Sequence, residues 1–319
     1  MKTVIITGGN SGLGYYCAQE IANNEDWQVI IACRNLEKAT QAVEKLKAAT
    51  NSDRITAMLL DLASLDSIRQ FAKEFAKREL PPLGAIVCNA GVQFIQRRTY
   101  TEDGFETTFG VNHLGHFLLV NLLLKQITPP ARIIFVSSDT HDPDKITGMP
   151  EPHFRDPKLL AKPERDPDLK NKSIDVAGRI AYTTSKLCNI LCAYELSRRL
   201  TEAGYSTEKQ PITVNVFNPG LMPGSGLAKD YPPVARFIWY SVLPILQLLP
   251  VVNGMKQSGK ALAKLVLDRD LENVTRKYFS GFKMTASSKE SSDRSLAKQL
   301  WQGSIKLTEL KPEETILKL

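Results

Sequence analysis

Histidine and cysteine, side chains that often bind transition metals, are scarce in this 319-residue sequence, with four and five copies. Cys188 and Cys192 are four residues apart in a helical pattern without a second pair of ligands, so the sequence predicts no zinc or other metal site. An odd number of cysteines, mostly within apolar segments, is typical of reduced, buried thiols in a cytosolic protein. They are Cys17, Cys33, Cys88, Cys188 and Cys192.

The sequence also lacks an apolar run long enough to cross a membrane. Residues 237–252 are uncharged, but they are fewer than the roughly 20 residues that a span requires, and Pro244 and Pro250 interrupt them. Residues 3–7 already have the pattern of a strand, which leaves no room for a signal peptide ahead of the fold. We therefore expect a cytoplasmic protein, with peripheral membrane contact through residues 237–252 as an alternative.

Dense basic clusters are absent as well. Lys and Arg outnumber Asp and Glu by 41 to 34, a net charge of +7, but the positive residues are dispersed. Surfaces that bind nucleic acid are usually built from clustered Lys and Arg, so we predict no nucleic-acid partner. A dispersed positive excess remains compatible with a polyanionic cofactor.

What the sequence does contain is a regular alternation of strand-like and helix-like segments. The short runs are apolar on both faces, as a parallel sheet covered by helices requires, and amphipathic segments such as residues 35–49 separate them. This predicts an α/β fold, a doubly wound Rossmann-type parallel sheet of about seven strands with helices on both faces, formed by residues 1–319 as a single domain. The predicted strands are residues 3–7, 28–33, 55–60, 84–89, 132–137 and 212–217.

Two long stretches break this alternation. Residues 139–178 are rich in Pro, Asp and Lys and show no clear period, and so long an insert in a compact domain is typically functional. Residues 221–252 end in aromatic and aliphatic side chains, among them Phe237, Trp239 and Tyr240. We interpret this second stretch as a lid or apolar wall of a substrate pocket, with core packing at helical spacing as the alternative.

Four glycines occur within residues 8–14, directly after the first predicted strand and at the start of a helical pattern. Because glycine has no Cβ, Gly8, Gly12 and Gly14 permit a tight turn and let backbone amides approach a pyrophosphate at the positive end of the helix. A turn without a ligand is the alternative for the pattern taken alone. Its position after the first strand favours a dinucleotide site.

The end of the second strand indicates which dinucleotide binds. An acidic residue there accepts hydrogen bonds from a ribose hydroxyl, whereas an arginine pairs with a 2′-phosphate. Residues 32–34 read Ala-Cys-Arg, so Arg34 predicts NADP(H), unless it only ends the strand in solvent. Asp61, after the third strand, is expected to bind the adenine amine or to cap the next helix.

Tyr182 and Lys186 are four residues apart in a helical segment, which places them on one face about 6 Å apart along the axis. An ammonium favours ionisation of a nearby phenol, so we expect Lys186 to lower the pKa of Tyr182 and make it a general acid. A solvent-exposed pair is the alternative. Ser137 and Ser138 end the fifth strand at the ligand-binding edge of the sheet, and they either hold a carbonyl oxygen or only begin a turn.

In order and spacing, these segments resemble the short-chain dehydrogenase/reductase family over nearly the whole chain. The resemblance implies a catalytic tetrad in which Ser138 and Tyr182 hold a carbonyl, Lys186 also grips the nicotinamide ribose, and Asn112 anchors a water that relays protons to Lys186. The matching motifs are TGGNSGLG at 7–14, CNAG at 88–91, VNHLGHF at 111–117, VSS at 136–138, YTTSK at 182–186 and NPG at 218–220. The implied cofactor contacts are Gly8, Asn10, Ser11, Gly12, Leu13, Gly14, Arg34, Asp61, Leu62, Asn89, Ala90, Gly91, Tyr182, Lys186, Pro219 and Gly220.

The segments ACRN at 32–35, SKLCN at 185–189 and KYFSG at 277–281 most resemble the branch of retinol dehydrogenases and light-dependent protochlorophyllide oxidoreductases, which use NADPH and bulky apolar substrates. The long insert also resembles that of the photoenzymes. Those enzymes, however, carry Thr where this chain has Ser138, and a cysteine, their proposed proton donor, where it has Leu221. The usual threonine after Pro-Gly is also missing, with Ser225 as a candidate replacement.

The sequence therefore predicts an NADPH-dependent oxidoreductase that transfers hydride to the carbonyl of a bulky apolar substrate and runs reversibly as an alcohol dehydrogenase, as a monomer or homodimer. Two alternatives stay open: light-driven reduction of a pigment C=C bond, and a sensor that binds NADP(H) without turnover. We interpret His113 and His116 as packing or capping residues rather than metal ligands. His141 and His153 are interpreted as solvated residues of the insert, with contact to the substrate as the alternative.

Overall fold

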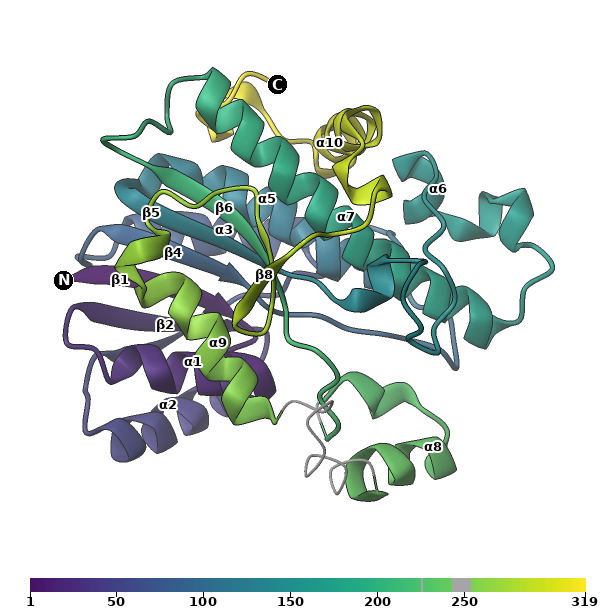
Figure 1. Cartoon of the computed structure of the whole chain (residues 1–319), viewed down its shortest axis with the longest axis horizontal. Coiled ribbons are helices and arrows are strands. Elements are labelled where there is room, and N and C mark those ends of the chain that lie inside the picture. Colours follow the sequence, from purple (N-terminus) through teal and green to yellow (C-terminus); the bar gives the residue numbers. More distant parts are fainter. Residues whose placement is uncertain (225, 243–253) are drawn as a thin grey trace.

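The computed structural model describes residues 1–224, 226–242 and 254–319, and its centre is an eight-stranded β-sheet (Figure 1). The strand order is β3-β2-β1-β4-β5-β6-β7-β8, and every pairing is parallel except that of β7 with β8. The doubly wound α/β fold is confirmed, with eight strands rather than about seven. The strands are β1 Lys2–Thr7, β2 Trp27–Cys33, β3 Ile55–Leu59, β4 Leu83–Cys88, β5 Ile127–Val136, β6 Ile212–Asn218, β7 Tyr278–Ser280 and β8 Lys283–Thr285.

Helices cover both faces of this sheet. Helices α1, α2 and α9 pack on one face, α3, α5 and α7 pack on the other, and α10 lies against α7 (Figure 1). The α-helices are α1 Gly12–Ala22, α2 Leu36–Thr50, α3 Leu65–Ala76, α4 Thr107–Phe109, α5 Gly115–Leu123, α6 Pro157–Ala161, α7 Ile174–Glu202, α8 Pro233–Phe237, α9 Met255–Leu267 and α10 Arg294–Thr308. The π-helical turns are η1 Gly110–Leu114 and η7 Ile238–Val242, and the 3₁₀ turns are η2 Leu124–Gln126, η3 Asp139–His141, η4 Pro163–Arg165, η5 Pro167–Leu169, η6 Gly226–Asp230, η9 Arg269–Leu271, η10 Glu290–Ser292 and η11 Pro312–Glu314.

The strands are apolar on both faces because each face meets a layer of helices. In β1, Val4 and Ile6 belong to the core cluster beneath α1, α2 and α9, whereas Ile5 belongs to the cluster beneath α3, α5 and α7. All three side chains are fully buried, and each burial stabilises the fold by about 1.5–3 kcal/mol. A slip of one residue would exchange the two faces, so this packing fixes the register of β1 and the position of the turn that follows it.

The order of the chain reverses beside β1, because β2 and β3 lie on one side of it and β4 to β8 lie on the other. In open parallel sheets, ligands bind at such a reversal, outside the carboxyl ends of the strands. The glycine turn follows β1, and residues 89–91 follow β4. The topology therefore places both segments at the same crevice.

The insert predicted at residues 139–178 is shorter and more structured than expected. Helix α7 already begins at Ile174, and η3, α6, η4 and η5 occupy much of the preceding segment. Helix α6 packs closely on α10, since a Cβ at Gly303 would lie 2.4 Å from Pro157. Residues 139–173 thus form a folded part of the protein, and α6 lies on the right of Figure 1.

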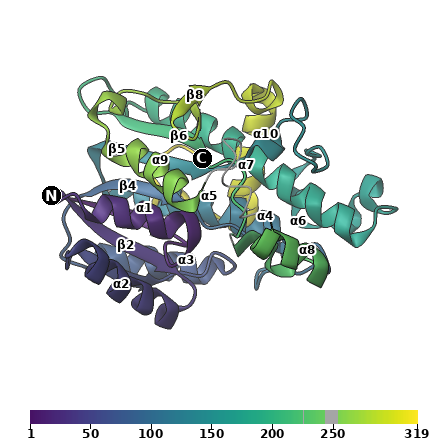
Figure 2. The ribbon, with the colours of Figure 1, turned by 60° about the horizontal axis from the view of Figure 1, so that its bottom comes forward.

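The lid predicted at residues 221–252 is described only in part, because Ser225 and residues 243–252 lie outside the described residues. Helix α8 lies away from the two helix layers in Figure 1, and it is drawn close to α4 and α6 in the view of Figure 2. Val234 and Phe237 on α8 are 73% and 65% exposed, so core packing is the wrong interpretation for this part of the segment. None of the described helices combines the length and hydropathy that a membrane span needs.

Candidate functional site

The turn between β1 and α1 depends on glycine at three positions. Gly8 and Gly12 have φ angles of +65° and +57°, a region that residues with a Cβ rarely adopt. Gly14 has no room for a side chain, because a Cβ there would lie 2.5 Å from Asn89 Nδ2 and 2.8 Å from the Gly8 carbonyl oxygen. The start of α1 therefore packs directly on the backbone at the end of β1.

The first turn of α1 presents backbone N–H groups to the crevice. Ser11 is the N-cap residue, but its side chain makes no capping hydrogen bond, and the first turn contains no acidic residue. Asn10, Ser11 and Leu13 lie in this turn as predicted, with Leu13 buried and Ser11 exposed. An uncapped helix N-terminus beside close-packed glycines fits an anion such as a pyrophosphate.

Thr7, the last residue of β1, joins the glycine turn to the loop after β4. Its hydroxyl oxygen accepts hydrogen bonds from the backbone N–H groups of Asn89 and Ala90, both at 2.9 Å, and lies 2.9 Å from His116 Nε2. Asn89 Nδ2 donates to the Thr7 carbonyl oxygen at 2.7 Å. The side chain of Asn89 is therefore occupied in holding the turn. Sequence reasoning missed Thr7, although it is the first residue of TGGNSGLG.

His116 sets the direction of the hydrogen bonds around Thr7. Its Nδ1 lies 3.0 Å from the Asn112 carbonyl oxygen, which can only accept, so Nδ1 carries the proton and Nε2 accepts from the Thr7 hydroxyl. Burial lowers the pKa of His116 to about 4, and the ring is neutral at pH 7. His113 is also buried and lies 2.8 Å from Ser304 Oγ. Both histidines are packing residues, as predicted.

Arg34 follows β2 at the crevice and is exposed. The Gly8 N–H donates a hydrogen bond to the Ala32 carbonyl oxygen at 2.9 Å, which holds this end of β2 against the glycine turn. Arg34 makes no hydrogen bond or ion pair with any residue in the described ranges. Its guanidinium is thus a cation beside the turn that the described chain itself does not neutralise.

Asp61 follows β3 and does not cap the next helix. Its Oδ1 accepts a hydrogen bond from the Ala63 N–H at 2.9 Å, whereas Ser64 is the N-cap residue of α3. The capping alternative for Asp61 is therefore wrong, and adenine binding stays a prediction. Leu62 is buried, and it packs so closely on the start of α5 that a Cβ at Gly115 would lie 2.7 Å from its carbonyl oxygen.

Tyr182 and Lys186 lie on α7, with only 7% and 4% of their surface exposed. Lys186 Nζ is 5.4 Å from the centroid of the Tyr182 ring, so the predicted pair on one helix face is confirmed and the solvent-exposed alternative is wrong. The expected lowering of the Tyr182 pKa is also wrong: burial raises it, and the nearby phenol of Tyr231 adds to the rise. In this buried place, the loss of water around the phenolate is the main cause of the rise.

The amine of Lys186 lies where the ends of β4 and β5 meet. It donates a hydrogen bond to the Val136 carbonyl oxygen at 3.3 Å, and burial lowers its pKa to about 8. A Cβ at Gly91 would lie 3.5 Å from both Lys186 Nζ and Asn112 Oδ1. The structure therefore brings Gly91, Asn112, Tyr182 and Lys186 together at the carboxyl edge of the sheet.

Asn112 lies in the π-helical turn η1 and links two parts of this site. Its Nδ2 donates to the Val92 carbonyl oxygen at 3.0 Å and to Ser185 Oγ at 2.9 Å, while its Oδ1 accepts from the Val92 N–H at 2.8 Å. Ser185 in turn donates to the Tyr182 carbonyl oxygen at 2.7 Å. Both amide hydrogens of Asn112 are thus used to join the loop after β4 to α7.

Ser138 differs from Ser137 in having an available hydroxyl hydrogen. Ser137 Oγ donates to the Lys186 carbonyl oxygen at 2.8 Å. Ser138 Oγ accepts from the Thr140 N–H at 3.3 Å, and its hydrogen has no acceptor among the residues that the structure describes. His141 Nδ1 lies 2.6 Å from the Ser138 carbonyl oxygen, and Nε2 accepts from the Ser288 N–H at 3.1 Å. His141 is fully buried, so its prediction as a solvated residue is wrong.

Pro219 and Gly220 follow β6 at the same edge. Gly220 has φ +75°, and its N–H donates to Asn218 Oδ1 at 3.0 Å. Ser258 on α9 donates to the Pro219 carbonyl oxygen at 2.9 Å. Leu221 follows this turn and is 48% exposed. Ser225, the candidate replacement for the missing threonine, lies outside the described residues.

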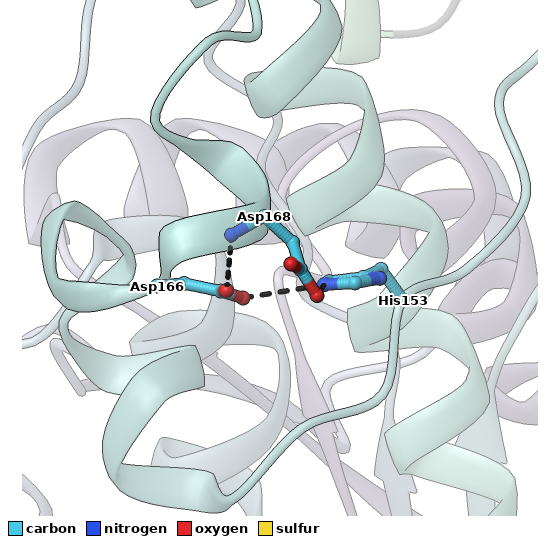
Figure 3. Close-up of side chains that lie close together, drawn as sticks. All are labelled: His153, Asp166 and Asp168. Carbon is cyan, nitrogen blue, oxygen red and sulfur yellow. Dashed lines mark hydrogen bonds and ion pairs between the residues drawn. The ribbon is translucent and has the colours of Figure 1, made fainter.

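Figure 3 shows His153 pointing at the carboxylates of Asp166 and Asp168 within the insert. Nε2 lies 3.2 Å from Asp166 Oδ2 and 3.8 Å from Asp168 Oδ2, and these are the only described residues that place three metal-ligand atoms within 4.8 Å. Arg155 already pairs with Asp168. The His153 N–H donates to Thr184 Oγ1 on α7 at 2.8 Å. His153 thus connects the insert to α7. The prediction of a solvated residue is wrong.

Comparison with known proteins extends over most of the chain. Residues 2–147 match the family model described as short chain dehydrogenase. The chloroplastic protochlorophyllide reductase of Daucus carota is 37% identical over 327 residues, which cover 97% of this chain and 78% of the relative. Retinol dehydrogenase 13 of Homo sapiens is 36% identical over 311 residues, covering 97% and 85%. The WW domain-containing oxidoreductase of Gallus gallus is 33% identical over 308 residues, covering 96% and 68%.

Solved structures have the same fold. An uncharacterized protein of Mycobacterium Paratuberculosis superposes with a TM-score of 0.69 at 28% identity, covering 100% of this chain and 96% of that one. The angucycline C-6 ketoreductase LanV with bound NADP superposes with a TM-score of 0.60 at 21% identity, covering 88% and 93%. At that identity the second likeness establishes the fold alone.

Proposed function

Because the chain belongs to the short-chain dehydrogenase/reductase family of oxidoreductases, on the branch of protochlorophyllide reductase and retinol dehydrogenase 13, we propose that it transfers hydride between NADP(H) and the carbonyl of a bulky apolar substrate. The bound nicotinamide supplies or accepts the hydride. The observation that carries this proposal is the buried pair of Tyr182 and Lys186 at the carboxyl edge of the sheet, beside Asn112 and Gly91.

The residues at the glycine turn fit such a cofactor. Gly14 leaves no space for a Cβ, and the uncapped N-terminus of α1 presents backbone N–H groups to a pyrophosphate. The unpaired guanidinium of Arg34 is suited to a 2′-phosphate, which it can bind through two parallel hydrogen bonds. We therefore assign NADP(H) rather than NAD(H) as the cofactor.

Tyr182 acts as the general acid in the reduction. Its raised pKa keeps the proton on the phenol at neutral pH, so the proton leaves only when an alkoxide, a stronger base, develops on the substrate. The free hydroxyl hydrogen of Ser138 donates a second hydrogen bond to the same oxygen. The alcohol product forms from the hydride on carbon and the Tyr182 proton on oxygen, and the reverse sequence oxidises an alcohol.

Asn112 contributes to catalysis by holding other residues in place rather than by reacting itself. Through Val92 and Ser185 it fixes the loop after β4 against α7 and so keeps Tyr182 and Lys186 at the crevice. Its side-chain hydrogens are both engaged, so any water that relays protons to Lys186 uses oxygen acceptors of this residue. The relay itself stays a prediction.

The relatives raise a second candidate function, reduction of a pigment C=C bond in light, because a protochlorophyllide reductase is 37% identical to this chain. The exposed position after Pro219 and Gly220, where the resemblance expects a cysteine proton donor, holds Leu221. A leucine donates no proton, so we favour reduction of a carbonyl in the dark.

Consumption of NADPH by the purified protein tests the proposal. The substrates are a panel of aldehydes, ketones, retinoids and tetrapyrroles, each measured in the dark and in light. We expect turnover of carbonyl compounds in the dark, and a loss of kcat of about 10²–10⁴-fold in Tyr182→Phe, because the general acid is removed. Fluorescence titration should show that this variant binds NADPH as the wild type does.

The other outcomes separate the alternatives. Turnover restricted to a tetrapyrrole under illumination would assign the photochemical reaction. Tight NADPH binding without turnover of any compound would favour a sensor. Equal kcat in wild type and Tyr182→Phe would remove Tyr182 from the mechanism.

A further inference from the structure

Gln93 is a buried polar side chain with an unused hydrogen-bond donor. Only 4% of its surface is exposed, and its Oε1 accepts a hydrogen bond from the Tyr231 hydroxyl at 3.2 Å. Its amide nitrogen Nε2 is buried and has no hydrogen-bond partner among the residues that the structure describes. Buried amide groups are nearly always satisfied, because burial removes the hydrogen bonds that water would supply. The Nε2 of Gln93 is therefore available to donate a hydrogen bond to another molecule.

The backbone holds Gln93 close to the reacting centre. Gly91 lies against Lys186 Nζ and Asn112 Oδ1, and the next residue, Val92, is fixed through both its N–H and its carbonyl oxygen to the Asn112 side chain. Gln93 follows directly. Its position relative to Lys186 is therefore set by hydrogen bonds of the chain and not by a free loop.

The lid segment brings Tyr231 to the same place. Asp230 Oδ2 accepts hydrogen bonds from the N–H groups of Ile95 and Gln96, at 2.8 and 2.9 Å, which docks residues 230–231 on the loop after β4. The Tyr231 ring lies 5.6 Å from the guanidinium carbon of Arg179, which is on α7 one turn before Tyr182. The phenol of Tyr231 is near enough to raise the pKa of Tyr182.

We propose that Gln93 and Tyr231 form a polar subsite of the substrate pocket that binds a second oxygen of the substrate, next to the carbonyl that Tyr182 protonates. Gln93 Nε2 donates to that oxygen, and the Tyr231 hydroxyl orients the amide by donating to Oε1. Because the amide is an uncharged donor in a buried place, it suits a neutral acceptor oxygen such as that of a ketone or ester. This inference rests on the proposed function and narrows its substrate class to apolar carbonyl compounds that carry a second neutral acceptor oxygen, such as keto esters and diketones.

Binding measurements with matched ligands test the subsite without relying on turnover. A bulky apolar β-keto ester is compared with the ketone that has a methylene chain in place of the ester, both titrated into the protein saturated with NADP⁺, which has no hydride to transfer. We expect the wild type to bind the keto ester about tenfold more tightly, the effect of one additional hydrogen bond in a buried site. Gln93→Leu, which keeps the volume and removes the donor, should abolish this preference while the Kd of the ketone changes less than about threefold.

A second variant and a matched control complete the experiment. Tyr231→Phe, which leaves the amide without its orienting hydroxyl, should lose part of the preference. Gln70→Leu, a change of the same kind at an exposed position on α3, should keep it. Thermal melting and NADPH titration report whether each variant is folded.

The outcomes distinguish the two proposals. A preference that is absent in the wild type, or unchanged in Gln93→Leu, overturns the subsite even if the protein reduces simple ketones. A preference that is lost in Gln93→Leu establishes the subsite, and an absence of turnover with NADPH would then count only against the proposed reaction.

Discussion

Two regions of the molecule are held in different ways. In the glycine-turn region, residues 1–137, a single side chain connects several elements: the hydroxyl of Thr7 joins β1 to the loop after β4 and to α5 through buried hydrogen bonds. In the insert-and-lid region, residues 139–173 and 221–242, separate contacts hold the chain, such as Asp230 on the loop after β4 and His153 on Thr184. Substitutions at the residues that join elements of the first region should therefore destabilise the whole protein, whereas those in the second region should mainly weaken substrate binding.

The largest contrast should come from two glycines. In Gly14→Ala, the added methyl meets Asn89 Nδ2 at 2.5 Å and the Gly8 carbonyl oxygen at 2.8 Å, an overpacking that costs about 1–3 kcal/mol or more. We expect a lower Tm and loss of NADPH binding. Gly226→Ala in the lid meets only the flexible end of Lys229, at 3.1 Å, and should stay within about 0.5 kcal/mol of wild type. Equal Tm values for the two variants would show that the glycine turn is no more tightly packed than the lid.

The pH dependence of stability should reveal the buried ammonium of Lys186. Burial lowers its pKa from 10.5 to about 8, so between these values the unfolded chain binds a proton that the folded chain does not. The free energy of unfolding of the wild type should therefore rise with pH in this window relative to Lys186→Met, by a total on the order of 3 kcal/mol. Below pH 8 both states are protonated and the difference should be constant.

Urea unfolding of both proteins at pH 7, 8, 9 and 10 measures this difference. The cysteines of the unfolded chain titrate in the same range, whereas burial raises their pKa in the folded protein. Both proteins contain them, so their contribution cancels. A difference between the two proteins that does not change from pH 7 to pH 10 would show that Lys186 is not desolvated.

Arg34 should affect the choice of cofactor and little else. Removal of a charge-assisted contact to the 2′-phosphate in Arg34→Ala should weaken NADPH binding about 10- to 100-fold, with NADH binding and Tm nearly unchanged. Lys45→Ala, which removes another exposed cation in α2, serves as the control. Fluorescence titrations with both cofactors measure the effect, and a parallel loss of NADH binding would point to a damaged turn instead.

The smallest effect should follow from loosening the lid. Asp230→Ala removes the acceptor for the N–H groups of Ile95 and Gln96, and we expect KM for the substrate to rise about three- to tenfold while the Kd of NADPH stays constant. Asp230→Asn keeps an oxygen acceptor and should be intermediate. Steady-state kinetics with the best compound of the panel measure KM, and a matching change in NADPH affinity would mean that the two regions are not separate.

The same division explains what the sequence allowed us to predict. The first strand, the glycine turn and the pairing of Tyr182 with Lys186 depend on local pattern and helix geometry, and the structure has them as predicted. Strands β7 and β8 were both missed as individual strands because each has only three residues, and their pairing is a tertiary contact. Strand β5 begins at Ile127 rather than 132, since two prolines hide its start.

The burial and surroundings of individual side chains, in contrast, could not be predicted from the sequence. His141 lies among Pro, Asp and Lys residues that suggest a solvated loop, yet Ser138 and the distant Ser288 enclose it. Burial, rather than the neighbouring Lys186, determines the direction in which the pKa of Tyr182 shifts. The sequence could not show this, because the depth of α7 within the protein depends on the whole fold. Asp230 accepts hydrogen bonds from the loop after β4, from residues 134 or more positions away. No short sequence motif could predict such a contact.

The neutral ring of His116 has a further consequence. With a pKa of about 4, it stays mostly neutral in mildly acidic conditions, so the Thr7 hydroxyl continues to donate to Nε2 and to accept from the two backbone amides. The hydrogen bonds that join β1 to α5 through Thr7 and His116 should therefore be the same at pH 6 as at pH 7.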